Sequence, residues 1–541
     1  MDIVKEIIKK AKEREINKKE ELDQIKRELA KKYKGKFLPN FLLLKRYQEL
    51  LENGEIEKMP FLEEILKKRP IRSLSGIVTV SVLTKPYPCP GKCLYCPFQK
   101  GMPKSYLKKE PAAERAKNLK FNPYLQVQKR LEMLKTEGHP TDKIELRIIG
   151  GTWSYYPKKY QIWFMKECFR AANDFGENKK SKPKNLNPKK NLNSNLLTLK
   201  KEQKKNEKAK NRIVGISIET RPDFIDKKEI LRLRLLGVTM VELGVQSIDE
   251  KILEINQRGH GVKEIILATK LLKDAGFKVL YQMMLNLPGS NLEKDVKMFE
   301  ELFENQDFKP DYLKIYPCAL LKEAPLYKLY LKGEYKPYSK EELIDALKKI
   351  KTKIPYYVRI QRITRDIPAN YIIEGGVKIS NIREIVQKEM KKEGLFCKCI
   401  RCREVKENFN LKEKVYLFRE DYQASGGKEI FLSFETKDRK KLFSFLRLRI
   451  PNQNDIFIEV LKNSAIIREI KTFGELVPIG KKEIAPQHRG FGKKLLKKAQ
   501  EIAKKEFGLG KITVISGVGV RDYFRKLGYS LKDTYMVKKL F

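Results

Sequence analysis

Short apolar runs alternate with amphipathic helical stretches between residues 71 and 385, and this alternation restricts the fold more than any other feature of the chain. The runs long enough for buried strands lie at 77–82, 144–149, 213–218, 240–245, 279–285 and 313–316. Helical patterns such as that of residues 263–274 separate them. Repetition of strand and helix predicts a parallel sheet with right-handed crossovers, closed or partly closed into a barrel. A cofactor site in such a fold is expected at the carboxyl ends of the strands.

Three cysteines follow the first of these runs, and they are Cys89, Cys93 and Cys96. Thiolates are the usual ligands of iron–sulfur clusters, and four of them normally close a 4Fe–4S site. Three thiolates can therefore hold three irons and leave the fourth iron open. A zinc knuckle or three unrelated thiols are the alternatives. With Tyr95 before the last cysteine, the segment resembles the radical S-adenosylmethionine (SAM) enzymes, which implies a 4Fe–4S cluster and SAM, with Tyr95 beside these cofactors.

Residues at three further strand ends are candidate SAM contacts. Gly150, Gly151 and Thr152 follow the second run, and the two glycines allow the backbone to approach a ligand closely. In radical SAM enzymes the corresponding strand end contacts the amino group of SAM. Glu219 and Gln246 lie at the ends of the third and fourth runs, where a barrel centre would otherwise be apolar. A simple turn and structural hydrogen bonds are the alternative interpretations.

A second cysteine cluster lies near residue 400, where Cys397, Cys399 and Cys402 follow one another closely. Tetrahedral zinc takes four ligands, and this loop supplies three of them. Cys318 or a histidine would provide the fourth ligand, whereas Cys168 falls in a helical stretch and is expected to be buried. We therefore expect a structural zinc ion that joins two domains, with an additional iron–sulfur cluster as the alternative.

The chain changes character from about residue 413. The pattern predicts a strand at 446–450, a helix at 495–503 and a strand at 512–515, which is an α+β arrangement. Gln487, Gly490 and Gly492 stand at the start of the helix, where backbone N–H groups and the helix dipole favour a pyrophosphate. This segment resembles the acetyl-CoA loop of the GNAT acetyltransferases; an ordinary glycine turn is the alternative. The sequence contains no obvious general base for the acetylation of an amine.

The charge of the chain indicates a polyanionic partner. Lys and Arg number 116 against 69 Asp and Glu, a formal net charge of +47. Nucleic acid is the partner that such an excess favours, although a charged thermophilic surface is an alternative source. No secretory signal or membrane-spanning run is present, so no membrane partner is expected. Clustered thiols fit a reducing, cytoplasmic compartment.

Two segments outside the barrel and the C-terminal part are rich in basic residues. Residues 1–70 follow helical spacing with Lys, Arg and Glu between the apolar positions, which predicts either solvated helices on the main body or an RNA-binding arm. Residues 174–212 are rich in Lys and Asn, and the pattern predicts an exposed, loop-like insertion.

A radical SAM barrel followed by a GNAT domain resembles the family of the catalytic subunit of Elongator, in its stand-alone archaeal form. The sequences that carry the resemblance include PIRSLSG (70–76), IETRPD (218–223), NQRGH (256–260), ASGG (424–427) and FLRLR (445–449). The resemblance implies an α/β protein: a basic helical, tRNA-binding region (1–70), a partial (β/α)6 radical SAM barrel (71–385), a zinc-binding linker (386–412) and an α+β GNAT domain (413–541).

The activity that the resemblance implies is the placement of a carboxymethyl-type group on carbon 5 of the wobble uridine (34) of tRNA. A 5′-deoxyadenosyl radical would take hydrogen from the methyl group of acetyl-CoA, and the acetyl radical would add to carbon 5 of the base. Hydrolysis of the thioester would then release the modified base from coenzyme A. The partners would be tRNA, through its anticodon stem-loop, and an electron donor, while the sequence leaves a homodimer open. A protein lysine acetyltransferase with a structural barrel, or an RNA-binding scaffold, are the competing functions.

The resemblance also implies a set of acetyl-CoA contacts. They are Lys143 from the barrel, Glu469, Ile470, Lys471 and Thr472, then Phe491, Gly492 and Lys493, and finally position 524. The family commonly has two tyrosines where this chain has Tyr523 and Phe524. Tyr523 therefore remains the candidate for a catalytic hydroxyl, together with Lys143, and Phe524 is expected to pack against the pantetheine.

Overall fold

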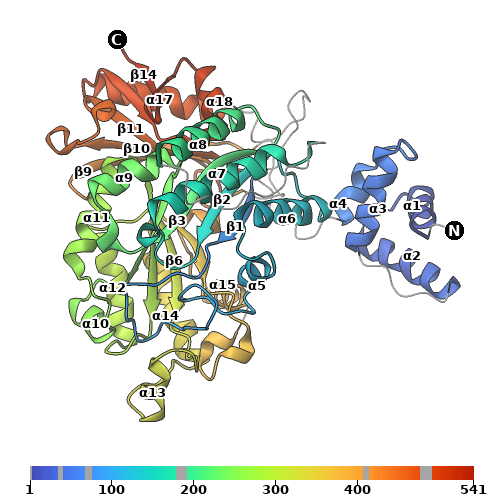
Figure 1. Ribbon diagram of the computed structural model, residues 1–541, viewed down its shortest axis with the longest axis horizontal. Coiled ribbons are helices and arrows are strands. Elements are labelled where there is room, and N and C mark those ends of the chain that lie inside the picture. Colours follow the sequence, from blue (N-terminus) through green and yellow to red (C-terminus); the bar gives the residue numbers. More distant parts are fainter. Residues whose placement is uncertain are drawn as a thin grey trace.

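Two seven-stranded sheets and a separate group of four helices make up the described part of the chain (Figure 1). The computed structural model describes residues 3–16, 18–33, 40–66, 76–177, 192–379, 381–405, 413–474 and 490–541. Within these ranges, no helix combines the length and the apolar character needed to cross a bilayer.

The first sheet is wholly parallel, and its strands lie side by side in chain order. The strands are β1 (Val78–Leu83), β2 (Lys143–Ile149), β3 (Arg212–Thr220), β4 (Met240–Gln246), β5 (Lys278–Leu285), β6 (Tyr312–Pro317) and β7 (Arg359–Ile363). The predicted partial barrel is confirmed, and its first six strands match the six apolar runs. The seventh strand was not predicted, because the sequence RIQRI carries polar residues toward a polar barrel interior.

Helices connect the strands of this half-barrel, and most of them cover its outer surface (Figure 1). They are α5 (Pro111–Asn118), α6 (Pro123–Thr136), α7 (Lys158–Asp174), α8 (Leu192–Asn206), α9 (Lys227–Leu235), α10 (Glu250–Ile255), α11 (Val262–Asp274), α12 (Leu292–Glu304), α13 (Leu326–Leu331) and α14 (Lys340–Lys353). Two short helices, α15 (Ile382–Lys392) and α16 (Ile400–Arg403), follow β7.

The prediction of a loop over residues 174–212 is wrong for its second half, which forms α8 and packs along α7. Its contacts are made mainly by buried amides rather than by an apolar stripe. Asn206 Oδ1 accepts a hydrogen bond from the Ile213 backbone at 2.8 Å, and Gln203 Nε2 donates to the Leu235 carbonyl at 3.0 Å. Hydrophobic periodicity cannot detect a helix that is held in this way. Residues 178–191 of the predicted insertion lie outside the described residues.

The N-terminal helices form a small unit with a core of its own. They are α1 (Ile3–Glu13), α2 (Lys19–Lys32), α3 (Asn40–Glu52) and α4 (Pro60–Leu66), and they lie beside α6 in Figure 1. Ile7, Leu22 and Tyr47 are among the residues buried between them. An ion pair of Lys135 with Glu52, at 3.1 Å, connects the unit to α6. The predicted helical character of residues 1–70 is therefore found as four helices.

The second sheet is mixed, in the order β13-β14-β12-β11-β10-β9-β8. Its strands are β8 (Tyr416–Ala424), β9 (Gly427–Glu435), β10 (Leu442–Pro451), β11 (Ser464–Thr472), β12 (Lys511–Val514), β13 (Ser530–Lys532) and β14 (Tyr535–Lys539), with helices α17 (Phe491–Lys505) and α18 (Arg521–Arg525). β11 is parallel to β12 and pairs with it only over residues 464–467. The end of β11, from Glu469 to Thr472, therefore extends beyond this pairing.

Buried ion pairs join this sheet to the amino ends of the barrel strands. Asp311 directly precedes β6, and its carboxylate accepts a 2.8 Å hydrogen bond from Arg468 of β11. Arg449 of β10 donates to Asp274 at 2.9 Å. The second sheet therefore covers the amino ends of the barrel strands. The carboxyl ends, where a cofactor was predicted, lie on the opposite face.

Candidate functional site

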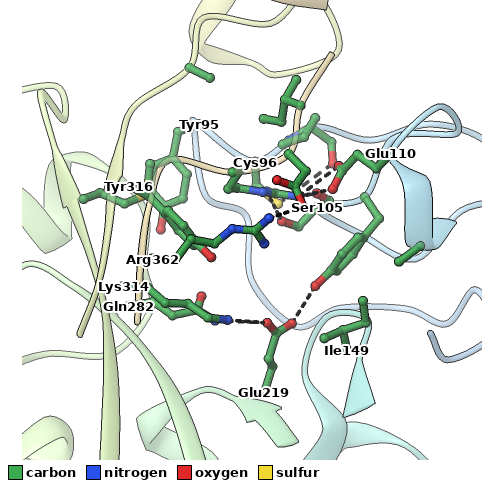
Figure 2. A pocket seen from close by; sticks show the side chains of 18 of the residues that line it. Tyr95, Cys96, Ser105, Glu110, Ile149, Glu219, Gln282, Lys314, Tyr316 and Arg362 are labelled. Atoms are coloured by element: carbon green, nitrogen blue, oxygen red, sulfur yellow. Dashed lines mark hydrogen bonds and ion pairs between the residues drawn. The ribbon is translucent and has the colours of Figure 1, made fainter. Parts of the chain in front are cut away.

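The cysteine loop lies at the carboxyl end of the half-barrel, as the sequence predicted from its position after the first strand. Cys89, Cys93 and Cys96 all line one cavity of about 110 Å³. A second cavity, of about 180 Å³, shares Cys96 and Glu219 with the first, among other residues (Figure 2). The predicted residues Tyr95, Gly151, Thr152, Glu219 and Gln246 also line the first cavity, so residues from four strand ends meet in one place.

The glycines after β2 bring the backbone against the loop that follows β1. Gly150 has a φ of 128°, which side chains rarely adopt, and a Cβ there would lie 2.0 Å from Thr84 Oγ1. That hydroxyl donates to the Gly150 carbonyl at 3.0 Å. Gly91 is also restricted, because a Cβ would lie 2.6 Å from Arg221 Nη1. Gly150 therefore requires glycine for space as well as for conformation, whereas a Cβ at Gly91 would displace the Arg221 guanidinium.

We expect Ala at Gly150 to destabilise the fold far more than Ala at Gly151. Both residues have positive φ, but a Cβ at Gly151 would meet only the Lys104 carbonyl, at 3.8 Å. Backbone strain alone costs about 1–3 kcal/mol. G151A should therefore lower the free energy of unfolding by about 1–2 kcal/mol, and G150A by about 3 kcal/mol or more, because Thr84 must also move. Urea unfolding of both variants checks this expectation, and equal losses would contradict it.

The three thiols of the loop fit a cluster better than a single ion. Their sulfur atoms do not all lie within 4.8 Å of one another. Thiolates on one zinc ion would be about 3.8 Å apart, given Zn–S bonds of about 2.3 Å. Gln246 Oε1, Arg221 Nη1 and Arg258 Nε, from residues that line the same cavity, are buried and have no hydrogen-bond partner among the described residues. Unsatisfied buried polar atoms of this kind indicate that a bound group completes the site.

The pKa values of Cys93 and Cys96 are shifted in opposite directions. Burial opposes ionisation of Cys93, but the charge of Arg258 and its hydrogen bond outweigh this effect and lower the pKa of Cys93. Burial raises the pKa of Cys96 to about 12, and the charge of Cys93 adds to the shift. Iron binding would have to displace the Cys96 proton, since metals bind the thiolate form.

Glu219 is the centre of a polar group between the two cavities (Figure 2). Its carboxylate accepts hydrogen bonds from Tyr106 OH at 2.7 Å, Lys314 Nζ at 3.0 Å and Gln282 Nε2 at 3.2 Å. Figure 2 shows Lys314 and Gln282 pointing toward Glu219 from neighbouring strands. These contacts fix the carboxylate at the wall of the cavity.

Glu242 forms a second layer of charge beneath this group. It accepts hydrogen bonds from Arg147 Nη2 at 3.0 Å and Ser217 Oγ at 2.9 Å, and it pairs with Lys314. Burial opposes ionisation, but Arg147 and Lys314 hold the pKa of Glu242 at about 2. Glu242, Arg147 and Lys314 were not predicted as site residues from the sequence. The available signal was a charged residue inside an otherwise apolar strand, such as Lys314 between Leu313 and Ile315.

The second cysteine cluster lies at the opposite end of the half-barrel. The ligand atoms of Cys397, Cys399 and Cys402 all lie within 4.8 Å of one another, which fits one tetrahedral ion. The backbone N–H of Ile400 donates to the carbonyl of Val358, just before β7, so the cluster stands at the amino end of that strand.

The prediction of Cys318 as the fourth ligand is wrong. Cys318 follows the carboxyl end of β6, is 3% exposed, and packs in a hydrophobic cluster with Tyr335. Because β6 and β7 are parallel and pair directly, Cys318 and the cysteine cluster stand at opposite ends of the sheet. The described residues place no fourth cysteine, histidine or carboxylate within 4.8 Å of the three thiols.

The glycine segment before α17 stands at the end of β11. Gly490 has a φ of 70°, and a Cβ on Gly492 would lie 3.7 Å from Thr472 Oγ1 and 3.8 Å from the Tyr523 hydroxyl. The predicted contacts Gly492, Thr472 and Tyr523 are therefore neighbours. Gln487 lies outside the described residues.

The side chains of the other predicted acetyl-CoA contacts differ in their exposure to solvent and in their partners. Phe491 and Phe524 are buried, and Phe524 lies in the core beneath α17, whereas Lys493 is exposed. Ile470 packs against that same core. Glu469 Oε2 accepts a 3.0 Å hydrogen bond from Arg447, so its carboxylate is committed to an ion pair.

Lys143 and Lys471 stand on the barrel side of this region. Lys143 is the first residue of β2, at the amino end of the barrel strands. Lys471 is half-buried near Arg359, Glu145 and Glu404, and desolvation, followed by repulsion from Arg359, lowers the pKa of Lys471. The acetyl-CoA contacts predicted from both parts of the chain thus lie toward the amino ends of the barrel strands, away from the cysteine loop.

Comparison with known families defines the class of protein. Residues 86–302 match the Radical SAM superfamily, and residues 310–392 match the Radical SAM C-terminal domain. The half-barrel, with three cysteines at its carboxyl end, is therefore a radical SAM domain.

Closer relatives extend over nearly the whole chain. The tRNA uridine(34) acetyltransferase of Methanocaldococcus jannaschii is 46% identical over 506 residues, 91% of this chain and 90% of the relative. Elongator complex protein 3 of Homo sapiens is 36% identical and covers 100% of this chain and 96% of the relative. The solved structure of archaeal Methanocaldococcus infernus Elp3 without residues 1–46 is 43% identical, with a TM-score of 0.73 over 86% of this chain and 100% of that one. The chain belongs to the tRNA uridine(34) acetyltransferase (Elp3) family.

Proposed function

We propose that this protein is a tRNA uridine(34) acetyltransferase that uses a 4Fe–4S cluster, SAM and acetyl-CoA to place a carboxymethyl group on carbon 5 of the wobble uridine. The observation that carries the proposal is the meeting of Cys89, Cys93 and Cys96 in one cavity at the carboxyl end of the half-barrel, in a chain of this family. The activity is that named for relatives at 46% and 44% identity.

The three cysteines would hold the cluster and leave one iron for SAM. When bound, these cofactors supply one-electron reductive chemistry that starts a carbon-centred radical reaction. The backbone after β2 and the side chains of Glu219 and Gln246 would orient SAM. The fixed Glu219 carboxylate and the adjoining 180 Å³ cavity, which is lined by Arg147, Lys314 and Arg362, offer a polar space for the reacting base.

The second sheet and α17 would form the acetyl-CoA site of a GNAT domain. The N-terminus of this 15-residue helix presents backbone N–H groups, which favour the pyrophosphate of coenzyme A. Residues 469–472 of β11 pair with β10 on one side, but their other edge extends beyond the pairing with β12. That free edge can form main-chain hydrogen bonds with the pantetheine, in the way that an added strand would. Lys143 would contact the coenzyme from the barrel.

The basic N-terminal helices would bind the anticodon stem-loop of tRNA, and Cys397, Cys399 and Cys402 would hold a structural zinc. Lys and Arg exceed Asp and Glu by 47 over the chain. Contacts with phosphates make binding steeply dependent on salt concentration. The protein would act in the cytoplasm.

The proposal is tested by mass spectrometry of nucleosides. Unmodified tRNA is incubated anaerobically with the reconstituted protein, SAM, acetyl-CoA and a reductant. A uridine heavier by a carboxymethyl group is expected, and it should be absent when SAM is omitted. If no new nucleoside forms while cluster content and tRNA binding are both verified, the proposal fails. Acetylation of a protein substrate without SAM would then favour a lysine acetyltransferase.

Replacement of Tyr523 with phenylalanine is expected to slow modification about 100-fold, the lower range for loss of a general acid. The Tyr523 side chain is 42% exposed, and its hydroxyl lies beside the helix N-terminus. Burial of the hydroxyl raises the pKa of Tyr523, so the group stays protonated and can donate a proton to the departing thiolate. Tyr416, equally exposed on β8, is the control; Y416F should match the parent rate. A full rate for Y523F would exclude this role.

Replacement of Cys399 with serine is expected to release the zinc ion. Cys399 is fully buried among the three thiols, and its loss leaves two thiolates. Metal analysis should fall from about one zinc per chain to near zero, with a lower melting temperature, because structural zinc contributes directly to folding. Equal zinc content in C399S and the parent protein would contradict the assignment.

A further inference from the structure

Arg258 is a buried cation that contacts a cysteine of the cluster loop. Its Nη1 donates a hydrogen bond to Cys93 Sγ at 3.1 Å, and the residue is 5% exposed. Among the described residues, no carboxylate forms an ion pair with Arg258, and its only sulfur contact is the Cys93 thiol. A buried guanidinium without an anion is costly. The cysteine loop and whatever it binds are therefore the counter-charge of Arg258.

Two further contacts fix the guanidinium in this position. Arg258 Nη2 donates to the carbonyl of Gly244 at the end of β4 and lies 2.9 Å from His260 Nε2. Burial, followed by repulsion from Arg258, lowers the pKa of His260 to about 4, so the ring is neutral at pH 7 and its Nε2 accepts this bond. The side chain is thus held from the barrel on one side and presents Nη1 to Cys93 on the other.

A second arginine, Arg221, lies near the cysteine loop, but its charge is paired with a carboxylate. Arg221 Nε and Nη2 donate to Asp223 at 2.9 and 2.8 Å, so its charge is paired. Among the described residues, Arg221 forms no hydrogen bond with a cysteine of the loop. The unpaired charge and the direct hydrogen bond at Cys93 both belong to Arg258.

We infer that Arg258 is a positioning residue that raises the reduction potential of the cluster held by Cys89, Cys93 and Cys96. Reduction adds one negative charge to the cluster, and a fixed cation with an N–H···S bond to a ligating thiolate stabilises that charge. The chain thereby makes the first electron easier to deliver. The inference depends on the proposed function only for the presence of the cluster.

The experiment is a redox titration of the reconstituted protein, followed by the electron paramagnetic resonance signal of the reduced cluster, without tRNA or acetyl-CoA. For R258Q, the ratio of reduced to oxidised cluster at the parental midpoint is expected to fall at least tenfold, which is about 59 mV for one electron. R258K keeps the positive charge, but a single ammonium group cannot donate to both Gly244 and Cys93 as the planar guanidinium does. Its ratio should fall about threefold, in the same direction.

The matched control is R232Q, which removes a partly buried arginine that pairs with Glu229 on α9. Its cluster should keep the parental midpoint.

Iron and sulfide are counted in each variant, and the midpoint potential is measured for every variant that holds a full cluster. An unchanged midpoint in such an Arg258 variant overturns the inference. Loss of the cluster from both Arg258 variants, with melting temperatures unchanged, also overturns it, because Arg258 would then serve assembly. Failure of the proposed function would show instead as a parent protein that modifies no tRNA, whatever its midpoint.

Discussion

Replacement of Cys96 with serine is expected to abolish formation of the modified uridine, with a loss of more than about 100-fold, since loss of an outer partner of a metal site already costs 10- to 100-fold. Cys96 lies in both cavities at the carboxyl end of the half-barrel, and a cluster with one open iron requires all three thiolates. Iron content after reconstitution and nucleoside mass spectrometry measure the effect.

Cys168 provides the control for loss of a thiol. It is fully buried in α7, in the core of the half-barrel, and lines neither cavity. C168A should bind iron and modify tRNA as the parent protein does. If C96S formed the modified nucleoside at the parental rate without iron, the cysteine loop would have no role in the reaction.

Replacement of Arg468 with alanine is expected to lower the free energy of unfolding by about 3–5 kcal/mol, the cost of breaking a buried ion pair. Arg468 is fully buried and donates to Asp311 of the barrel at 2.8 Å and to Glu429 of its own sheet at 3.1 Å. Removal of the guanidinium leaves two carboxylates buried at the junction of the two sheets. Chemical unfolding at pH 7 measures the loss.

The pH dependence identifies the cause of this loss. Burial opposes ionisation of Asp311, but Arg468 and Arg447 hold its pKa well below the usual range. In the parent protein the ion pair therefore stabilises the fold above about pH 4, the pKa of an unfolded Asp, and this contribution is lost as the pH falls through the folded-state pKa. The difference between R468A and the parent should shrink at low pH.

Arg419 is the matched control for Arg468. It also contacts two carboxylates, Asp421 and Glu506, but its side chain is 32% exposed. Exposed pairs contribute about 0–1 kcal/mol. If R419A and R468A lost similar stability, burial would not be the source of the effect.

Local patterns were sufficient to predict most of the half-barrel. Each of the first six strands is an apolar run, and the cysteine loop and Gly150 follow such runs directly, so chain order alone placed them at one end of a parallel sheet. The same argument brought Glu219 and Gln246 to the cavity. These residues share a site because of topology, which a sequence with regular strand–helix repetition reveals.

Features that depend on contacts between distant residues were not predictable in this way. In the sequence, Lys314 and Glu242 are single charged residues within apolar strands. Only the folded barrel shows that they form an ion pair. Arg258 lies 165 residues from Cys93 in the sequence, and only the fold shows that they touch. Cys318 was assigned to zinc by counting thiols, which ignores the length of the strands that separate the two ends of a sheet.

The buried ion pairs between the two sheets also impose an order on synthesis. Asp311 precedes Arg468 by 157 residues, and Asp274 precedes Arg449 by 175. At about 5–20 residues per second, the ribosome takes about 8–35 s to supply these partners. During that interval the nascent half-barrel carries bare carboxylates on its amino-end face, which must stay hydrated. A chain that stops before residue 449 therefore keeps Asp274 and Asp311 without the arginines that pair with them in the complete molecule.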